Sequence, residues 1–388
     1  MIHRVRLKNY MSFGEPTQTA ELRPITVLVG ANNSGKTNFL RMVDFMRARG
    51  GGFFPYFHRP SRNRNLEIQW DGDVPEATDR AVVEGPGVAT YRVIAVTTKD
   101  SKIKLQESII ENKEQVYTQI GLLNDPAERM FRNTLVDRAN VNIQADLLPR
   151  THPQLAGIAN VEALMSPVFN ARHVHPFVTD LKADNQLAAN VSIGPQGSNL
   201  SALVAHWILE EPEKAAEFNA TLAKCLPEMR GVHARCVQPG MVRLEFEQRD
   251  GERFDSTQVS DGVLIFAGLI AHSIEAPRGA LVLMEEPERG IHPRRLVELV
   301  DILRTLVHER GVQFIMATHS PALINQFRDE PEAILAFSRS ANGTMIRRIS
   351  DLPELTETLT RTDPGELLAS GFFNEPEPPP TTKPDDPT

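Results

Sequence analysis

The segment GANNSGKT at residues 30–37 constrains the fold of this chain more than any other. It has the spacing G-x-x-x-x-G-K-[ST], in which glycines let the backbone curl until successive N–H groups point at phosphate oxygens. The apolar run PITVLV (24–29) precedes it, which predicts a buried strand. A helical stripe follows it, formed by Phe39, Met42, Val43 and Met46. A strand, a glycine-rich loop and a helix in this order predict a phosphate-binding loop.

The residues of this loop have separate predicted roles. Lys36 is expected to reach the β- and γ-phosphates of a nucleotide, and the Thr37 hydroxyl is placed to ligate Mg²⁺. The alternative is a glycine-rich turn with an incidental lysine, and the two flanking elements disfavour it. The whole predicted nucleotide-binding set is Gly30, Asn32, Asn33, Ser34, Gly35, Lys36, Thr37 and Asn38.

Two carboxylates follow a second apolar run, ALVLM (280–284). In phosphate-loop ATPases an acid at a strand end holds the Mg²⁺ shell, and a neighbouring carboxylate can orient or deprotonate the attacking water. Adjacent residues on a strand point in opposite directions, so the two need not share a role. We assign Glu285 to the metal and Glu286 to the water. Taken alone, the pair could equally be an acidic strand edge; the phosphate loop favours function.

A histidine follows a third apolar run, QFIMA (313–317). Between the second and third runs, Pro293 opens a predicted helix and Gly311 ends it, which indicates a strand–helix–strand unit with parallel strands. Ligands of open α/β sheets bind beyond the carboxyl ends of such strands. His319 is therefore expected to contact the γ-phosphate or the attacking water, although a lone histidine is more often structural.

The remaining chain gives weaker signals. Residues 88–120 alternate and predict antiparallel strands, residues 198–226 predict helix, and residues 241–255 predict a hairpin turning near Asp250 and Gly251. His173 and His175 could share one face of a strand, as metal ligands sometimes do, but no further ligand accompanies them, which favours a structural role. The acidic, proline-rich tail 374–388 is expected to be disordered.

Charge and composition narrow the classes of function. The net charge of −8 argues against a basic coat for nucleic acid, although residues 41–64 hold six Arg against one Asp. This segment could contact nucleic acid or be a solvated loop. Two cysteines, no apolar leader and no apolar run long enough to span a bilayer favour a cytoplasmic protein without a membrane partner.

Five segments together resemble a known family: VRLKNYMSFG (5–14), GANNSGKTNFL (30–40), VSDGVLIFAGL (259–269), LMEEPERGIHP (283–293) and ATHSP (317–321). The chain resembles the ABC-type ATPase heads of recombination-repair and chromosome-maintenance proteins. More closely, it looks like bacterial AAA-type ATPases related to the overcoming-lysogenization-defect (OLD) family. Residues 121–231 resemble that family only loosely.

The resemblance implies an α/β fold of the P-loop NTPase class: an ABC-type ATPase head with a mixed central sheet, an antiparallel β subdomain and an inserted helical region. The head would comprise residues 1–84 and 232–373, with residues 85–231 inserted and 374–388 as the tail. It also implies a homodimer or higher homo-oligomer that sandwiches ATP, with Ser260, Asp261 and Gly262 capping the nucleotide of the partner copy. Glu286 would be the catalytic base and His319 the switch histidine.

Several departures from the family pattern affect the expected function. Glu285 stands where many relatives have Asp, which favours a water-mediated metal contact, and Gln69 is a weak candidate for the glutamine loop. Long coiled-coil arms and a nuclease domain after His319 are not evident in the sequence. We therefore expect an ATPase or sensor subunit of an anti-phage or genome-maintenance system that controls a separate, nuclease-like effector. The alternatives are a DNA-binding repair ATPase, a transporter nucleotide-binding subunit and a nucleotide or nucleoside kinase.

Overall fold

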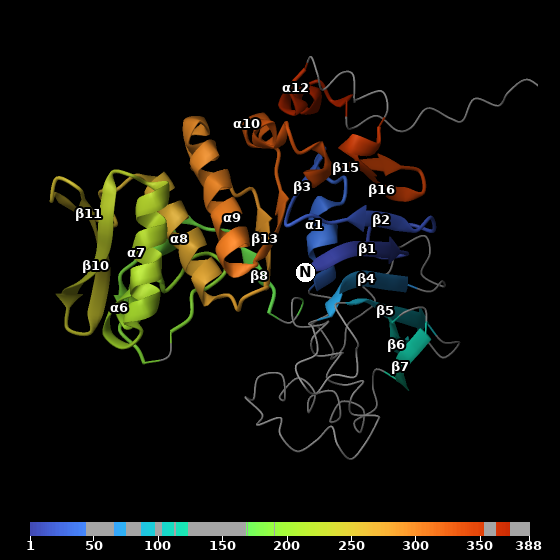
Figure 1. Cartoon of the computed structure of the whole chain (residues 1–388), viewed down its shortest axis with the longest axis horizontal. Coiled ribbons are helices and arrows are strands. Elements are labelled where there is room, and N and C mark those ends of the chain that lie inside the picture. The colour runs from blue at the N-terminus through green and yellow to red at the C-terminus, as the bar shows by residue number, and fades with distance from the viewer. Residues whose placement is uncertain are drawn as a thin grey trace, which may run out of the picture.

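The computed structural model describes residues 1–43, 66–74, 87–97, 103–111, 114–122, 168, 170–189, 191–352 and 362–372. These residues form layers: a group of helices, a central sheet, and a second, antiparallel sheet on the opposite side (Figure 1). Most of the basic segment 41–64 and all of the tail 374–388 lie outside the described residues. Within the described part of the chain, no helix has the length and apolarity needed to cross a bilayer.

The central sheet has the strand order β16-β15-β3-β14-β13-β8. Its strands are β3 (Ile25–Gly30), β8 (Arg172–Val174), β13 (Leu281–Glu285), β14 (Gln313–Ala317), β15 (Ile334–Ser340) and β16 (Gly343–Arg348). Neighbouring strands are parallel except β15 and β16, which form an antiparallel hairpin. The sheet is therefore mixed, as predicted. The carboxyl ends of β3, β13, β14 and β15 share one edge of the sheet, so the loops that follow them lie together.

Side chains of the central strands alternate between two hydrophobic cores. In β3, Val27 and Val29 belong to the core under the helices, while Leu28 belongs to the core between the two sheets. In β13, Val282 and Met284 face the helices, and the residues between them face the other sheet. A strand buried on both faces is apolar throughout, which explains why these segments are continuous hydrophobic runs in the sequence.

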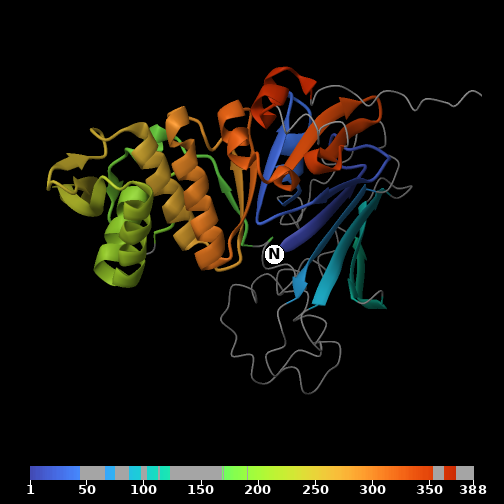
Figure 2. The same ribbon diagram turned by 45° about the horizontal axis from the view of Figure 1, so that its top comes forward.

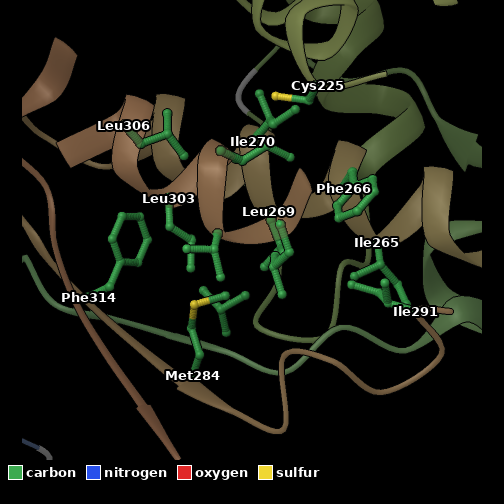
Figure 3. Close-up of a cluster of buried hydrophobic side chains, with 14 of the residues drawn as sticks. Cys225, Ile265, Phe266, Leu269, Ile270, Met284, Ile291, Leu303, Leu306 and Phe314 are labelled. Carbon is green, nitrogen blue, oxygen red and sulfur yellow. The ribbon is translucent and has the colours of Figure 1, made fainter. Parts of the chain in front are cut away.

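The helices cover one face of the central sheet. They are α5 (Val178–Leu181), α6 (Leu200–Glu210), α7 (Pro212–Cys225), α8 (Asp261–Glu275) and α9 (Leu296–Arg310). Figure 3 shows side chains of α8 and α9, among them Leu269 and Leu303, packed near Met284 and Phe314 of the sheet. The predicted helical region 198–226 consists of two helices, because Pro212 begins a new helix directly after Glu211.

The second sheet is antiparallel and has the order β2-β1-β4-β5-β6-β7 (Figure 2). Its strands are β1 (Ile2–Lys8), β2 (Gln18–Glu21), β4 (Leu66–Val74), β5 (Gly87–Thr97), β6 (Ile103–Glu111) and β7 (Glu114–Leu122). The antiparallel strands predicted over 88–120 are thus confirmed. Helix α1 (Lys36–Leu40) contributes Phe39 and Leu40 to the core between the sheets. Gln69 lies inside β4 opposite Arg6, so it belongs to a strand and not to a loop.

A third, smaller sheet lies beside α6 and α7, and the remaining elements are short. The sheet comprises β9 (Asn185–Gln186), β10 (Met229–Gln238), β11 (Met241–Gln248) and β12 (Arg253–Asp255), and it contains the predicted hairpin at Asp250 and Gly251. The short elements are η3 (Pro293–Arg295), α10 (Pro321–Ile324), η4 (Asn325–Phe327), η5 (Pro331–Ala333), η6 (Ile349–Asp351) and α12 (Pro364–Ala369).

Strand pairing crosses both expected domain boundaries. The boundary between residues 84 and 85 falls between the paired strands β4 and β5, and the boundary between residues 231 and 232 falls within β10.

One buried glutamine joins the two large sheets. The Gln313 side chain, at the start of β14, accepts a hydrogen bond from Ile2 N at 2.9 Å and donates to Ile2 O at 2.7 Å. It also donates to Arg23 O at 3.2 Å. A fully buried amide is stable only when its polar atoms are bonded, and these contacts satisfy that requirement. They also fix the start of β1 relative to the central sheet.

Candidate functional site

A cavity of about 840 Å³ lies at the carboxyl edge of the central sheet. It is lined by Asn32, Asn33, Ser34, Gly35, Lys36, Thr37, Asn38, Glu285, Glu286, Ala317, His319 and Arg339. The predicted loop, the acidic pair and the histidine therefore share one cavity, although more than 240 residues separate the loop from the acidic pair in the sequence. The order β3-β14-β13 explains this arrangement, since the three strands are parallel and end at the same edge.

Glycines are required in the loop by both backbone conformation and space. Gly30 and Gly35 have φ angles of 139° and 113°, in the region that side chains disfavour. A Cβ at Gly30 would overlap the carbonyl group of Phe337, and a Cβ at Gly35 would overlap the Thr344 hydroxyl. Asn33 also adopts a positive φ of 62°, which asparagine tolerates better than most residues. The loop is thus a close-fitting backbone turn at the N-terminus of α1.

Lys36 is folded back onto its own loop. Its Nζ donates hydrogen bonds to Gly30 O at 2.8 Å and to Ala31 O at 2.9 Å, and the residue is only 6% exposed. Burial lowers the pKa of Lys36 to about 8, while the nearby Glu286 and Glu285 carboxylates act to raise it. An anion in the cavity would favour the charged ammonium further, because opposite charge stabilises the protonated form.

The two carboxylates reach the cavity in different ways. Glu285 is the last residue of β13, whereas Glu286 lies beyond the strand with a φ of 48°. The strand-alternation argument therefore does not apply to Glu286, and both residues line the same cavity. The Glu286 backbone N–H donates to Ala317 O at 2.8 Å, which ties this turn to the end of β14. His175 Nδ1 lies 3.0 Å from Glu285 O, so this histidine contacts the backbone of the acidic turn.

His319 follows β14, and its imidazole lies near enough to Lys36 to be affected by the charge of that lysine. Burial lowers the pKa of His319 below its ordinary value, Lys36 lowers it further, and Glu286 opposes both effects. The imidazole is consequently neutral at pH 7, with one nitrogen able to donate and one able to accept a hydrogen bond. Such a group can hold a water molecule or a phosphate oxygen without adding a charge.

Four residues that the sequence analysis did not single out support the cavity. Thr318 donates to Glu288 Oε1 at 2.5 Å, and burial raises the pKa of Glu288. Arg339 Nη1 donates to Asn33 O at 3.2 Å, and the Thr344 hydroxyl lies 2.7 Å from Ser34 O. Two signals were available for the first pair: Glu288 is two residues after Glu286, and Thr318 directly precedes His319. Neither Arg339 nor Thr344 belongs to a sequence motif.

The predicted signature residues lie outside this cavity. Ser260 is the N-cap of α8, with its side chain accepting a 3.5 Å hydrogen bond from Val263 N. Ser260 and Asp261 are exposed, Gly262 is buried, and Asp261 forms a 2.8 Å ion pair with Lys182. None of the three lines the cavity of its own chain. Gln69 is likewise absent from the cavity lining.

Fold and site together define the class of protein: a P-loop AAA-type domain with the fold of a chromosome-maintenance ATPase head. The chain belongs to the family described as "AAA domain, putative AbiEii toxin, Type IV TA system", whose model matches residues 25–325. No curated protein matches the chain.

Two solved structures share the fold. One is an Smc head bound to the C-winged helix domain of ScpA, with 14% identity, 89% of this chain and 97% of that chain covered, and a TM-score of 0.52. The other is an Smc head with an extended coiled coil, bound to the C-terminal domain of ScpA and derived from Pyrococcus furiosus. It has 13% identity, 93% and 99% coverage, and a TM-score of 0.51. The resemblance to chromosome-maintenance heads is thus confirmed as a likeness of fold, while the relation to the OLD family stays a prediction.

Proposed function

We propose that this chain binds ATP in the 840 Å³ cavity and hydrolyses it by in-line attack of water on the γ-phosphate. The observation that carries this proposal is the convergence of the phosphate loop, the acidic pair and His319 on one cavity. A phosphate-binding turn alone would support only nucleotide binding. Carboxylates and a neutral imidazole beside it add the groups that hydrolysis requires.

Each residue has a role that follows from its surroundings. Lys36 exchanges its bonds to Gly30 O and Ala31 O for bonds to phosphate oxygens, and backbone N–H groups at the start of α1 complete the phosphate cradle. Glu286 accepts a hydrogen bond from the attacking water and takes up its proton. His319 holds the water and a γ-phosphate oxygen in line through its neutral ring.

The cavity also fits the magnesium ion that accompanies ATP. Mg²⁺ prefers oxygen ligands, and it usually keeps several waters while binding one or two carboxylates together with substrate phosphates. A hydroxyl oxygen on Thr37 and a carboxylate on Glu285 line the same cavity, which matches that donor set. These two residues would hold the ion, Glu285 through a water molecule, and the ion would neutralise phosphate charge.

We further propose that ATP joins two copies of the chain and that hydrolysis releases them. Ser260 and Asp261 are exposed at the N-terminus of α8 and lie outside the cavity of their own chain. A second copy could therefore present Ser260, Asp261 and Gly262 to the nucleotide, as in the ATPase heads that the sequence resembles. The output of such a cycle is a change in association between subunits.

The cellular role that we favour is the ATPase or sensor subunit of a bacterial defence or genome-maintenance system. Two findings support it: the family description names a putative toxin of a Type IV TA system, and the similar Smc heads are each bound to a domain of ScpA, another protein. By analogy, this chain would regulate a separate, nuclease-like effector.

Phosphate release from ATP and Mg²⁺ by the purified chain tests the proposed chemistry. Lys36→Ala should lose ATP binding, because the loop then lacks its ammonium group. Wild-type ATP affinity in this variant would mean that the loop does not hold the phosphates. Phosphate transfer to an acceptor other than water would indicate a kinase instead.

Size-exclusion chromatography tests the proposed dimer. Glu286→Gln should keep ATP binding, abolish turnover and elute as a dimer when ATP is present. Glu252→Gln is a matched control, because Glu252 is exposed in the β11–β12 turn, away from the cavity. A Glu286→Gln protein that binds ATP but stays monomeric would remove the role of residues 260–262 in trans.

A further inference from the structure

Arg339 is the cavity residue whose chemistry the proposed ATPase site leaves unused. It is exposed, it lines the cavity, and it lies near the end of β15, more than 300 residues from the loop that it contacts. Among the residues lining the cavity, Arg339 and Lys36 are the two that carry a positive charge at pH 7, since His319 is neutral. The other charged lining residues are the carboxylates Glu285 and Glu286.

The register of the central sheet explains why Arg339 is beside the loop. Strands β15 and β3 are parallel, and Phe337 lies opposite Gly30, where β3 ends and the loop begins. The next residues of β15 therefore continue alongside the loop while β3 does not. Arg339 Nη1 donates to Asn33 O at 3.2 Å, and Thr344, from the other strand of the hairpin, bonds the next carbonyl, Ser34 O.

Among the described residues, the Arg339 guanidinium uses little of its hydrogen-bonding capacity. Its bond to Asn33 O uses one of five N–H donors, and within the described residues it forms no ion pair with a carboxylate. By contrast, Arg243 in β11 is bonded to both Asp184 and Asp255. An arginine with free donors on the wall of this cavity matches the fork geometry that binds phosphate oxygens.

We propose that Arg339 is a nucleotide-positioning residue that contacts the phosphate chain of the bound nucleotide through its guanidinium. This inference rests on the proposed ATP site and adds a second cation to it, supplied by the β15–β16 hairpin. A triphosphate brings several negative charges to a cavity that already contains two carboxylates. The Lys36 ammonium and the proposed Mg²⁺ would balance only part of that charge, and Arg339 improves the balance.

Two substitutions test the role of the charge. Arg339→Met removes the cation and its donors while keeping a long side chain, and it should weaken ATP binding at low salt by at least about tenfold. Arg339→Lys keeps the charge and should recover most of that affinity. Wild-type ATP affinity in Arg339→Met, measured by calorimetry, would overturn the proposal.

Two further measurements separate a phosphate contact from a merely structural tether of the loop. Arg339→Met should reduce the salt dependence of ATP binding, because it removes an electrostatic contact to phosphate. It should also lower the affinity for ATP much more than the affinity for adenosine, which has no phosphate. Thr344→Val is the matched tether control: it removes the hydroxyl that bonds Ser34 O and Ser12 Oγ but no charge, so its salt dependence should equal that of the wild type. Equal weakening of ATP and adenosine in Arg339→Met, or an unchanged salt dependence, would overturn the phosphate contact. If the wild-type chain binds no ATP, the proposed function itself has failed, which is a separate outcome.

Discussion

The Thr318 hydroxyl donates a hydrogen bond to Glu288 Oε1 at 2.5 Å and thereby joins the loops that follow β13 and β14. The same hydroxyl accepts a hydrogen bond from Ser320 N at 3.0 Å. The first loop carries Glu286 and the second carries His319, so the Thr318–Glu288 bond links the loops of the two groups proposed to hold the attacking water. Burial raises the pKa of Glu288, which is consistent with a carboxyl group enclosed between the loops.

Glu288→Ala should lower the ATPase kcat by about tenfold or more with little change in KM, because misplacement of catalytic groups lowers the rate more than it weakens binding. Glu288→Gln keeps an oxygen that accepts the Thr318 hydroxyl and should retain most of the activity. Steady-state kinetics of the two variants measure the difference. A wild-type kcat in Glu288→Ala would show that the bond does not position the loops.

Gly35→Ala should abolish ATP binding and destabilise the fold by about 1–3 kcal/mol, because φ is 113° there and the new Cβ would overlap the Thr344 hydroxyl. Gly251→Ala provides a control, since Gly251 has a φ of 91° with no atom within 4 Å of the added Cβ. The control should lose about 1 kcal/mol of stability and keep full ATP affinity. Urea unfolding and nucleotide titration of both variants test this contrast, and normal ATP binding by Gly35→Ala would contradict it.

His319→Gln should lower kcat by about 10²-fold, the lower end of the range for a group that assists proton transfer or holds the water. The pKa of His319 is lowered by burial, so its neutral form predominates down to a pH below the ordinary histidine value. The wild-type kcat at saturating ATP should therefore stay level from pH 8 to about 6.5 and fall only below that. A pH–rate profile tests this: the fall must be reduced in His319→Gln, and an identical acidic limb would assign it to another group.

Acid should destabilise the fold partly through His272, which is 1% exposed within α8. Burial lowers its pKa to about 3 from an unfolded value of 6.5, so between these values the unfolded chain binds a proton that the folded chain does not. The contribution of His272 to the free energy of unfolding is complete above pH 6.5, declines as the pH falls, and is fully lost below about pH 3. The loss is on the order of 5 kcal/mol.

His272→Leu should therefore unfold with a weaker pH dependence than the wild type between pH 6.5 and 4. Its stability at pH 7.5 provides the reference that separates a packing change from proton linkage. Chemical unfolding at several pH values measures the effect. Parallel pH curves for the two proteins would mean that His272 does not titrate differently in the folded state.

The spacing of residues in the sequence is by itself enough to identify much of the site. The G-x-x-x-x-G-K-[ST] pattern, the acidic pair and His319 each follow an apolar run, and each run is a strand of the central sheet. These features are legible because a strand buried on both faces must be apolar throughout, and because a loop that wraps a phosphate needs glycine at set positions. Resemblance to a family then supplied the signature assignment for Ser260.

Only the tertiary structure decided which distant residues support that site. Arg339 and Asn33 are separated by 306 residues, and Gln313 and Ile2 by 311, and no local pattern records either contact. The position of β15 beside β3 follows from the packing of the whole sheet, which brings an otherwise ordinary arginine to the cavity wall. Glu286 reaches the cavity through a turn with a φ of 48°, a conformation that alternation along a strand cannot anticipate. Hydrophobic periodicity reflects only the local conformation of residues that are close in the sequence. Strand order and long-range side-chain contacts are instead set by the free energy of the complete fold.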